Sequence, residues 1–344
     1  MRQVLLERPG VIRGQEVGDP PRPRAGEVLV EIARVGLCGT DYHAFHGEQP
    51  FFQYPRVLGH ELSGVVRAVG PDVDLPLGTE VAVIPYLPCG ACRACRAGAT
   101  NRCRALSVLG VHQDGGLMLD LIVPVAQLYH RPGLDLDQLA TLEPLAIGAH
   151  AVRRSVATED DVVVVIGGGP IGLGILARLR HLGVSPYLVE SAPERREFAQ
   201  AWLPGIRALP SPGALEAFRE AEGPDLANVV FDATGSRESM RSALEWAGPG
   251  GQVVWVGLTQ GSVDVEDPLF HQRELTLKAS RNATRDDFDA VAEMMIDLSI
   301  DLNRWVRRRY PATEEGLGQA FAAWGPAPGE TGVKILLENG PRRS

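Results

Sequence analysis

The sequence predicts an α/β protein in which a β-rich part accompanies a doubly wound parallel sheet. Up to about residue 150, short β-branched runs are separated by glycine and proline, which is typical of strands joined by turns. From about residue 151, continuous apolar strands alternate with helical patterns. Apolar strands of this kind are typical of a parallel sheet that is buried on both faces.

The β-rich part shows its clearest strands at residues 28–32 and 62–69. In the second part, the expected strands are 161–166, 186–189, 228–231 and 252–256. Helices are expected at 170–182, from about 193, at about 239–247 and at 286–298. The Pro/Gly-rich stretch 325–329 predicts a loop, and residues 332–337 predict one more strand.

Composition excludes several classes of function. The net charge is −9, the hydrophobic fraction is 44% and the charged fraction is 22%, which is ordinary for a soluble globular protein. The longest basic cluster is residues 307–309, so nucleic-acid and membrane-surface partners are not expected. The N-terminus has no apolar signal-peptide region, and no apolar run reaches the length of a membrane span. A cytoplasmic location is therefore expected.

A glycine-rich turn predicts a dinucleotide site. Residues 167–172 fit G-x-G-x-x-G between a buried strand and a helix, which is the context that gives this pattern meaning. Glycines allow the tight turn, the approach of the pyrophosphate and close helix–strand packing, while the helix N-terminus faces the phosphates. Glu190 ends the next strand, where a carboxylate can accept hydrogen bonds from the adenosine ribose and repel a 2′-phosphate. The alternative is a plain glycine turn with an incidental glutamate. The residues assigned to this turn are Gly167, Gly169, Pro170, Ile171 and Gly172.

Four of the five cysteines lie in one short segment. Cys89, Cys92, Cys95 and Cys103 offer four soft ligands, which suit a closed tetrahedral zinc site. Such a site leaves no position for water, so this metal would stabilise a loop. An iron–sulfur cluster is the alternative, because four thiolates also hold one.

A second group of candidate metal ligands comes from three separate segments. Cys38 and His60 supply a thiolate and an imidazole, and Glu61 and Glu143 are candidate oxygen ligands. A catalytic zinc needs a few protein ligands and one exchangeable position. Each residue alone has an ordinary explanation, since a lone buried cysteine is usually a small hydrophobe. The nucleotide motif and the cysteine segment favour the metal interpretation.

Together these motifs resemble the zinc-containing medium-chain alcohol dehydrogenases. Within that family the chain is similar to the sorbitol/threonine dehydrogenase branch, including bacterial polyol and L-galactonate-type enzymes. The resemblance implies a GroES-like catalytic zinc domain at 1–149 and 285–344 and a Rossmann dinucleotide-binding domain at 150–284. The matching segments follow the family order: 38–43, 59–61, 89–103, 114–116, 143–145, 167–172 and 232–235.

The resemblance also implies roles for single residues. Cys38, His60 and an acidic residue would hold the catalytic zinc, with Glu61, Glu143 or water completing its shell. Asp41 would orient the zinc-bound histidine. Thr40 would take the substrate proton and His43 would pass it to solvent. Arg195 matches an adenosine-binding position, Thr234, Val256 and Leu258 match the nicotinamide-binding segments, and Arg281 is a candidate for binding a substrate carboxylate.

The implied cofactors are NAD(H) and two Zn²⁺ per chain, one catalytic and one structural. The implied reaction is oxidation of a secondary alcohol on a polyol, sugar or sugar acid to a ketone by hydride transfer. A homodimer or homotetramer is expected, with strands near 253–256 as candidate edges for pairing between subunits. The alternatives to this function are an L-threonine 3-dehydrogenase-like activity, a zinc-free reductase and a non-catalytic NAD-binding protein. Arg281 has its own alternative, which is pairing with a protein carboxylate or contact with the cofactor.

Overall fold

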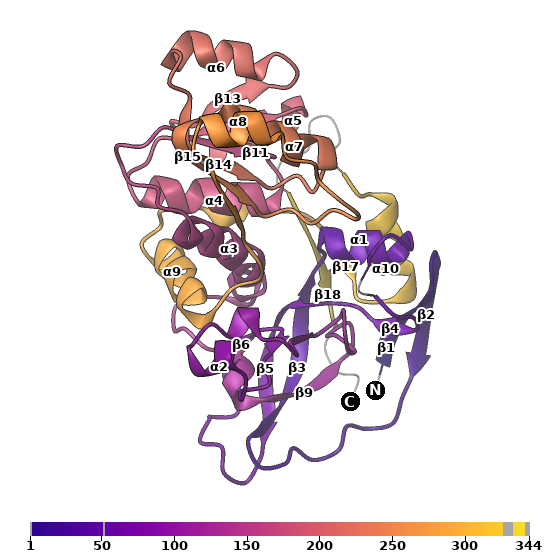
Figure 1. The fold of residues 1–344 in the computed structure, drawn as a ribbon. Coiled ribbons are helices and arrows are strands. Elements are labelled where there is room, and N and C mark those ends of the chain that lie inside the picture. Colours follow the sequence, from indigo (N-terminus) through magenta and orange to yellow (C-terminus); the bar gives the residue numbers. More distant parts are fainter. Residues whose placement is uncertain (1, 51, 326–332, 341–344) are drawn as a thin grey trace. The chain divides into compact units, whose positions relative to one another are not determined.

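The computed structural model describes residues 2–50, 52–325 and 333–340 (Figure 1). The chain forms two compact units. Unit 1 contains Met1–Glu143, Val306–Gly325 and Lys334–Ser344, and unit 2 contains Pro144–Trp305 and Pro326–Val333. The predicted boundaries at 149/150 and 284/285 differ from this division. The second differs because α9 (Arg285–Ile296) contacts α4 (Pro170–His181) and so belongs to unit 2.

Unit 1 is built around a seven-stranded mixed sheet. Its longest strand, β3, alternates inward-facing residues, so that Val28, Val30 and Ile32 are buried in the core. The predicted strands at 28–32 and 62–69 correspond to β3 and β5. The sheet order is β10 (Leu128–Tyr129), β6 (Glu80–Val83), β5 (Glu61–Val69), β3 (Glu27–Gly36), β18 (Lys334–Glu338) and β17 (Val306–Pro311), and β9 (Asp120–Pro124) also pairs with β3.

Smaller elements complete unit 1. A three-stranded sheet has the order β2 (Val11–Glu16), β1 (Arg2–Arg8) and β4 (Arg56–Val57), and β7 (Tyr86–Leu87) pairs with β8 (Ser107–Val108). The helices are α1 (Gly39–Phe45), α2 (Arg93–Arg96), α10 (Glu314–Ala322) and the short 3-10 turns η1 (Thr100–Arg102) and η2 (Val125–Gln127). Helix α3 (Leu136–Arg154) begins in unit 1 and continues into the sequence of unit 2.

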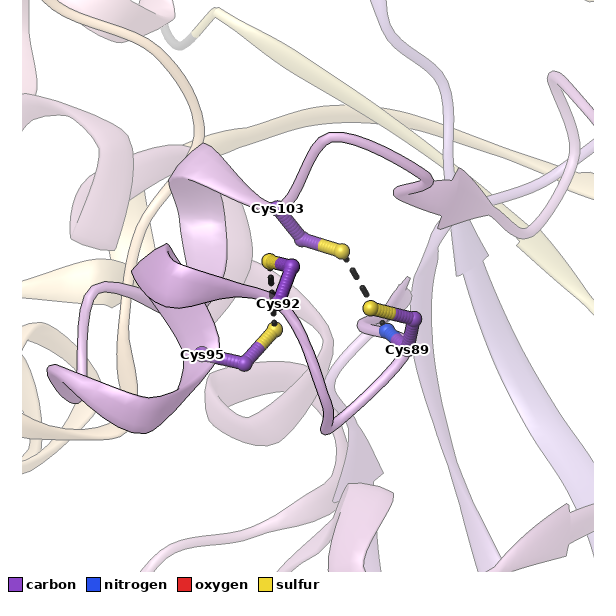
Figure 2. A group of neighbouring side chains, drawn as sticks. All are labelled: Cys89, Cys92, Cys95 and Cys103. Atoms are coloured by element: carbon purple, nitrogen blue, oxygen red, sulfur yellow. Dashed lines mark hydrogen bonds between the residues drawn. The ribbon is translucent and has the colours of Figure 1, made fainter.

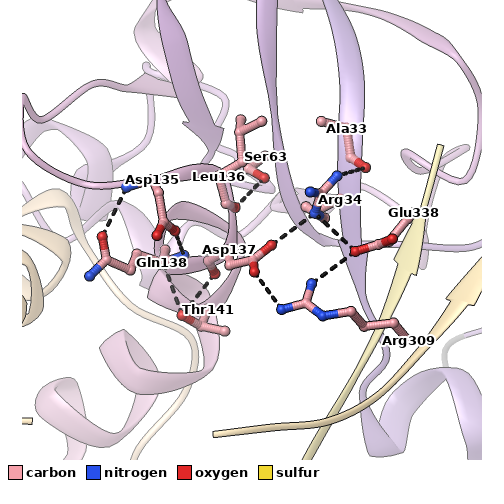
Figure 3. Close-up of polar contacts among 10 residues, drawn as sticks. All are labelled: Ala33, Arg34, Ser63, Asp135, Leu136, Asp137, Gln138, Thr141, Arg309 and Glu338. Atoms are coloured by element: carbon pink, nitrogen blue, oxygen red, sulfur yellow. Dashed lines mark hydrogen bonds and ion pairs between the residues drawn. The ribbon is translucent and has the colours of Figure 1, made fainter. Parts of the chain in front are cut away.

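An ion-pair network ties the C-terminal strands to the rest of unit 1 (Figure 3). Arg34 of β3 donates to Asp137 in the first turn of α3, at 2.8 Å. Arg309 of β17 bridges Asp137 and Glu338 of β18. The two guanidinium groups hold the pKa of Asp137 below its ordinary value, although burial acts in the opposite direction. The network therefore adds to the backbone ladder that pairs β18 with β3.

Unit 2 contains a six-stranded sheet in which every pairing is parallel. The order is β13 (Arg207–Pro210), β12 (Tyr187–Glu190), β11 (Val163–Ile166), β14 (Ala227–Asp232), β15 (Ala247–Trp255) and β16 (Thr276–Ala279). Helices α6 (Ala214–Glu222), α7 (Arg237–Trp246) and α8 (Asp267–Gln272) share one apolar cluster with the strands, while α4 lies on the opposite side of the sheet (Figure 1). The remaining elements are α5 (Pro193–Trp202), α9 and the 3-10 turn η3 (Leu302–Arg304). This arrangement confirms the predicted doubly wound sheet.

A strand forms near 252–256 as predicted, but the prediction that it lies at a sheet edge is wrong. It corresponds to β15, which is hydrogen-bonded to β14 on one side and to β16 on the other. Its backbone groups are therefore already paired within the chain. The ends of the described sheet order are β13 and β16.

Other predicted elements differ mainly at their ends. Strand β11 begins at Val163, because Asp161 accepts hydrogen bonds from both the backbone and the hydroxyl of Thr158 and closes a turn before it. The predicted helix at 286–298 is α9, which ends at Ile296, and Leu298 adopts a positive φ of 59°. Most of the predicted loop at 325–329 and the start of the predicted strand at 332–337 lie outside the described residues, whereas its remainder is β18. Among the described helices, none is long and apolar enough to cross a membrane.

Candidate active site

The four cysteines of the loop between β7 and β8 converge as predicted (Figure 2). Their sulfur atoms all lie within 4.8 Å of one another. Four sulfurs around one zinc, at Zn–S distances of about 2.3 Å, are separated by about 3.8 Å. The sulfurs that hold an iron–sulfur cluster would be farther apart, because they are distributed over two or four irons and cannot all surround one ion. The geometry therefore fits a single tetrahedral ion.

Backbone geometry prepares this segment for a metal. Cys92 begins the short helix α2, and the positive φ of Gly90 and Gly98, 69° and 75°, forms the turns around it. Backbone N–H groups of Cys95 and Arg104 lower the pKa of the Cys92 thiol to about 6. Thiolate is the form that binds zinc, so at Cys92 the loop favours the state that a metal requires.

Cys38, His60 and Glu61 form the second convergent group. One ligand atom from each lies within 4.8 Å of the others. Cys38 follows β3 at the N-cap of α1, and His60 directly precedes β5. Gly59 precedes this pair with φ of +98°, and a Cβ there would lie 2.8 Å from Val35, so the turn that presents His60 requires glycine.

Asp41, the predicted orienting carboxylate, lies beside His60. Its Oδ1 atom is 3.7 Å from Nδ1 of His60, and both side chains are buried. Its Oδ2 atom accepts a hydrogen bond of 2.9 Å from the backbone N–H of Cys38. Within the described chain, neither Oδ1 of Asp41 nor Nδ1 of His60 has a hydrogen-bond partner. The two atoms thus face each other but are too far apart for a hydrogen bond.

Glu61 has an ion-pair partner that the sequence analysis did not identify. Lys334, the first residue of β18, places its Nζ 2.7 Å from both carboxylate oxygens of Glu61. Both residues are buried. Burial lowers the pKa of Lys334, but Glu61 and the neighbouring acidic groups more than offset this and hold it above its ordinary value. A single lysine in the apolar run of residues 333–337 was the signal available in the sequence.

Glu143 is not one of the three convergent residues, but it interacts electrostatically with His60 and Glu61, and its hydrogen-bond partner differs from that of Glu61. The hydroxyl of Tyr86 donates a short hydrogen bond to its Oε1 atom, while Oε2 is buried with no partner among the described residues. Burial raises the pKa of Glu143 to about 7. Burial and the adjacent Glu143 raise the pKa of Tyr86 well above its ordinary value, so the phenol remains a donor. Tyr86 was also missed by the sequence analysis.

The two predicted proton-relay residues lie on α1. Thr40 is half-buried, and His43 lies three residues later on the same helix face, with an exposed side chain. Nδ1 of His43 is 2.9 Å from Oε2 of Glu48. This third residue was not predicted. A carboxylate at Nδ1 selects the tautomer in which Nε2 accepts a proton.

The predicted dinucleotide residues meet in unit 2. Gly167 has φ of +100°, and a Cβ on Gly172 would lie 1.8 Å from the carbonyl oxygen of Gly167, so both positions require glycine. Oε2 of Glu190 accepts 2.7 Å from the N–H of Gly168. Burial would raise the pKa of Glu190, but donation from the N–H groups of Ala192 and Gly168 holds it below its ordinary value. Arg195 lies 3.6 Å from the same carboxylate. The turn therefore presents an ionised acid beside the glycine loop.

The remaining predicted residues follow the carboxyl ends of neighbouring strands. Thr234 follows β14, where its N–H and hydroxyl both donate to Asp232. Val256 and Leu258 follow β15, and the Leu258 carbonyl lies 3.0 Å from the position of a Cβ on Gly235. Ligands of open parallel sheets bind at this edge.

Arg281 follows β16 and is exposed. Its neighbours Ser280 and Asn282 carry buried polar atoms, Oγ and Nδ2, that have no hydrogen-bond partner in the part of the chain that is described. Asn282 also has a positive φ of 53°. Buried polar atoms without a partner in the chain are satisfied by water, an ion or a ligand.

The chain matches two known domain families and a characterised relative. The alcohol dehydrogenase GroES-like domain matches residues 24–133, and the zinc-binding dehydrogenase domain matches residues 170–297. L-Galactonate-5-dehydrogenase of Escherichia coli (strain K12) is 44% identical over 293 residues, which cover 85% of this chain and 86% of that protein.

Solved structures agree with the fold. RspB from Escherichia coli CFT073, an alcohol dehydrogenase complexed with NADH, has a TM-score of 0.89 at 29% identity and covers 98% of this chain and 99% of its own. A zinc-binding dehydrogenase from Sinorhizobium meliloti 1021 bound to NADP has a TM-score of 0.87 at 30% identity and covers 98% of both chains.

The fold and the site define a zinc-dependent, nicotinamide-dinucleotide-linked dehydrogenase that acts on CH–OH groups. The chain belongs to the zinc-containing medium-chain alcohol dehydrogenase family, in the group that includes polyol and sugar-acid dehydrogenases. The predicted family and the predicted pair of folds, GroES-like and Rossmann, are therefore confirmed.

Proposed function

We propose that this protein oxidises a secondary hydroxyl of a sugar acid, sugar or polyol to a ketone, with NAD⁺ as the hydride acceptor. The convergence of Cys38, His60 and Glu61, whose ligand atoms all lie within 4.8 Å of one another, is the observation that carries the proposal. A thiolate, an imidazole and a carboxylate suit a catalytic zinc that keeps an exchangeable position. The similarity to L-galactonate-5-dehydrogenase supports the substrate class.

We assign Cys38, His60 and Glu143 as the zinc ligands. Glu61 is close enough by distance, but Lys334 already balances its charge through both oxygens. The partner of Glu143 is a neutral phenol, and its second oxygen is buried and has no partner in the described chain. A buried carboxylate is stabilised by a nearby cation, and a metal ion is a suitable one.

When bound, zinc supplies Lewis-acid polarisation of the substrate oxygen, and the nicotinamide ring accepts the hydride. Thr40 receives the hydroxyl proton, and His43 carries it to solvent at the exposed end of α1. Glu48 holds His43 by its Nδ1 atom, which leaves Nε2 as the acceptor. Asp41 keeps His60 in the orientation that presents its other nitrogen to the metal. The products are a ketone, NADH and one proton.

We propose NAD as the preferred cofactor. Glu190 is held ionised beside the glycine turn, and an anion there repels the 2′-phosphate of NADP. Arg196 donates to the backbone carbonyls of Glu190 and Ser191, so its guanidinium is engaged within the loop. Similar structures hold NADH in one case and NADP in another. The ratio of kcat/KM for the two cofactors is therefore the test of this proposal.

We propose that Arg281 recognises the carboxylate of an acidic substrate. It is exposed at the end of β16, next to the buried polar atoms of Ser280 and Asn282. Arginine binds carboxylates through two parallel hydrogen bonds. Its alternative role is contact with the cofactor or with a protein carboxylate.

A substrate panel scored by NADH absorbance tests the proposed function. It comprises L-galactonate, sorbitol, xylitol, D-glucose, L-threonine, 2-propanol and ethanol. We expect the highest kcat/KM on L-galactonate or a polyol, and Arg281→Ala should reduce activity on acids but not on neutral polyols. Ethanol as the best substrate by a wide margin would refute the substrate class. L-Threonine as the best substrate would favour the alternative activity.

We further propose that the enzyme assembles as a homodimer or homotetramer. Strand β16 ends the described sheet order of unit 2, so one of its sides is available for pairing with a second copy. Light scattering coupled to gel filtration measures this directly, and a 37.0 kDa species would contradict it.

A further inference from the structure

We infer that Tyr86 is a positioning residue that holds Glu143 in the orientation needed for the metal. The inference rests on the proposed zinc function. It concerns a side chain that is distinct from the ligands and from the proton relay. Tyr86 acts through Glu143 and does not itself contact the reacting atoms.

The contact between the two side chains carries the inference. Tyr86 is 5% exposed and Glu143 is 3% exposed, so water does not compete for their hydrogen bond. The phenol donates to Oε1 of Glu143. The other oxygen, Oε2, is buried and lacks a hydrogen-bond partner in the described chain. One oxygen is therefore held, and the other is left for a further partner.

The chemistry of the donor explains why the partner is a tyrosine. A phenol fixes the carboxylate by a hydrogen bond but leaves its negative charge in place. The ammonium group of Lys334, by contrast, compensates the charge of Glu61. Of the two buried glutamates, Glu143 thus keeps the charge that a divalent cation would balance. Partners that orient a metal ligand without binding the metal are a regular feature of zinc sites.

The fold also explains how Tyr86 is kept in place. Tyr86 pairs with Val108 across the β7–β8 ladder. The loop that connects these two strands carries the four cysteines, and Cys89 comes three residues after Tyr86. A zinc ion that closes this loop would therefore fix the strand that presents Tyr86. The structural metal would support the ligand geometry of the other site through this hydrogen bond.

Tyr86→Phe removes only the hydroxyl, and Tyr187→Phe is the matched control. Tyr187 is also buried, and its hydroxyl donates a short hydrogen bond to Glu222 in unit 2. Both variants of the zinc-loaded enzyme are challenged with a chromogenic chelator, and the rate of zinc release is followed. We expect Tyr86→Phe to release the labile zinc about 10- to 100-fold faster than wild type. Tyr187→Phe should release it at the wild-type rate.

Cobalt substitution gives a readout that lost packing would not change. In the Co²⁺ enzyme, Tyr86→Phe should shift the visible ligand-field bands, whereas Tyr187→Phe should not. Thermal unfolding, together with one retained tight zinc, checks that each variant folds. Tyr86→Leu is the second variant that removes the hydroxyl, should the phenylalanine variant be unstable.

A double-mutant cycle tests whether Tyr86 acts through Glu143. Adding Tyr86→Phe to Glu143→Gln should change the rate of zinc release by less than about twofold, because the carboxylate being positioned is already gone. Wild-type release rates and an unchanged cobalt spectrum in Tyr86→Phe would overturn the inference. A wild-type enzyme that holds no labile zinc would instead refute the proposed metal chemistry itself.

Discussion

Lys334 lies 2.7 Å from both carboxylate oxygens of Glu61, although 273 residues separate the two in the chain. The pair joins the first residue of β18 to the first residue of β5, inside the core of unit 1. It brings the C-terminal strand to the candidate metal site and gives one of the two buried glutamates there a cation of its own.

Lys334→Met should destabilise the protein strongly. It leaves Glu61 buried without its cation, which typically costs about 3–5 kcal/mol of unfolding free energy. Urea unfolding measures the change. Lys278, the other lysine of this chain, is only partly buried, so Lys278→Met is the control and should cost less than about 1 kcal/mol. Equal losses of unfolding free energy in the two variants would show that the buried ion pair contributes no more to stability than an ordinary lysine.

Mutations at the two metal sites should have different effects, one on turnover and the other on stability. Cys38→Ala should remove one zinc and nearly all turnover, while the fold survives. Cys95→Ala should instead lower Tm or solubility, because a structural zinc contributes to folding. Metal analysis of the pure, active wild type should find two zinc ions per chain. Active enzyme that contains neither zinc nor another divalent ion would refute the proposed chemistry.

The proton relay predicts graded losses. Thr40→Val should cut kcat severely, since the first acceptor of the proton is gone. His43→Ala should cost about 10- to 100-fold, the lower range of general acid–base effects, because water can replace the exposed outer end. Imidazole buffers should partly restore this variant. Glu48→Gln should cost only a few-fold, since the contact is exposed on both sides. Wild-type kcat in Thr40→Val and His43→Ala would exclude these residues from the mechanism.

Cofactor choice should depend on Glu190. Wild type should prefer NAD over NADP by at least about tenfold in kcat/KM, which corresponds to about 1.4 kcal/mol. Glu190→Gln keeps an oxygen for the N–H of Gly168 but removes the charge, so the preference should shrink. Steady-state kinetics with both cofactors measure the ratio. A wild-type preference for NADP would show that Glu190 does not select the cofactor.

Asp287 should make stability sensitive to acid. Burial alone would raise its pKa, but hydrogen bonds from His150 and Arg153 hold the pKa of Asp287 far below its ordinary value. A lowered folded-state pKa adds stability above the unfolded value of about 3.9, and this stability is lost as pH falls further. Unfolding free energies should therefore show a gap between wild type and Asp287→Asn at pH 7 that narrows towards pH 3.

The neighbouring Asp286 provides the control for this measurement. It is exposed in the first turn of the same helix, whereas Asp287 is buried. The difference between wild type and Asp286→Asn should stay nearly constant with pH. A gap for Asp287→Asn that does not change with pH would mean that the cluster is held by packing and not by charge.

Local signals explain what could be predicted before the structure was known. The glycine turn at 167–172 and the cysteine spacing at 89–103 are short motifs, so the residues that form each feature are close in sequence. Their geometry follows from the backbone: Gly167 and Gly172 occupy positions that tolerate no side chain. The ends of helices and strands were predicted less accurately than the motifs. Turn contacts such as those between Thr158 and Asp161 decide them.

Long-range pairing explains what was missed. Nothing near Glu61 in the sequence indicates Lys334, and nothing near Glu143 indicates Tyr86. The same reason explains why 252–256 was wrongly predicted as a sheet edge. An apolar strand has the same sequence pattern whether it pairs with a neighbour on one side or on both.

By itself, the sequence determined the family and the two folds and predicted two groups of candidate metal ligands, because these depend on recognisable residue types in short motifs. Only the tertiary structure decided which partner each buried carboxylate takes. Glu61 has a lysine and Glu143 has a phenol. The physical reason is that a buried charge is stabilised by whatever group the fold places within hydrogen-bonding distance, and sheet pairing between distant segments sets that distance.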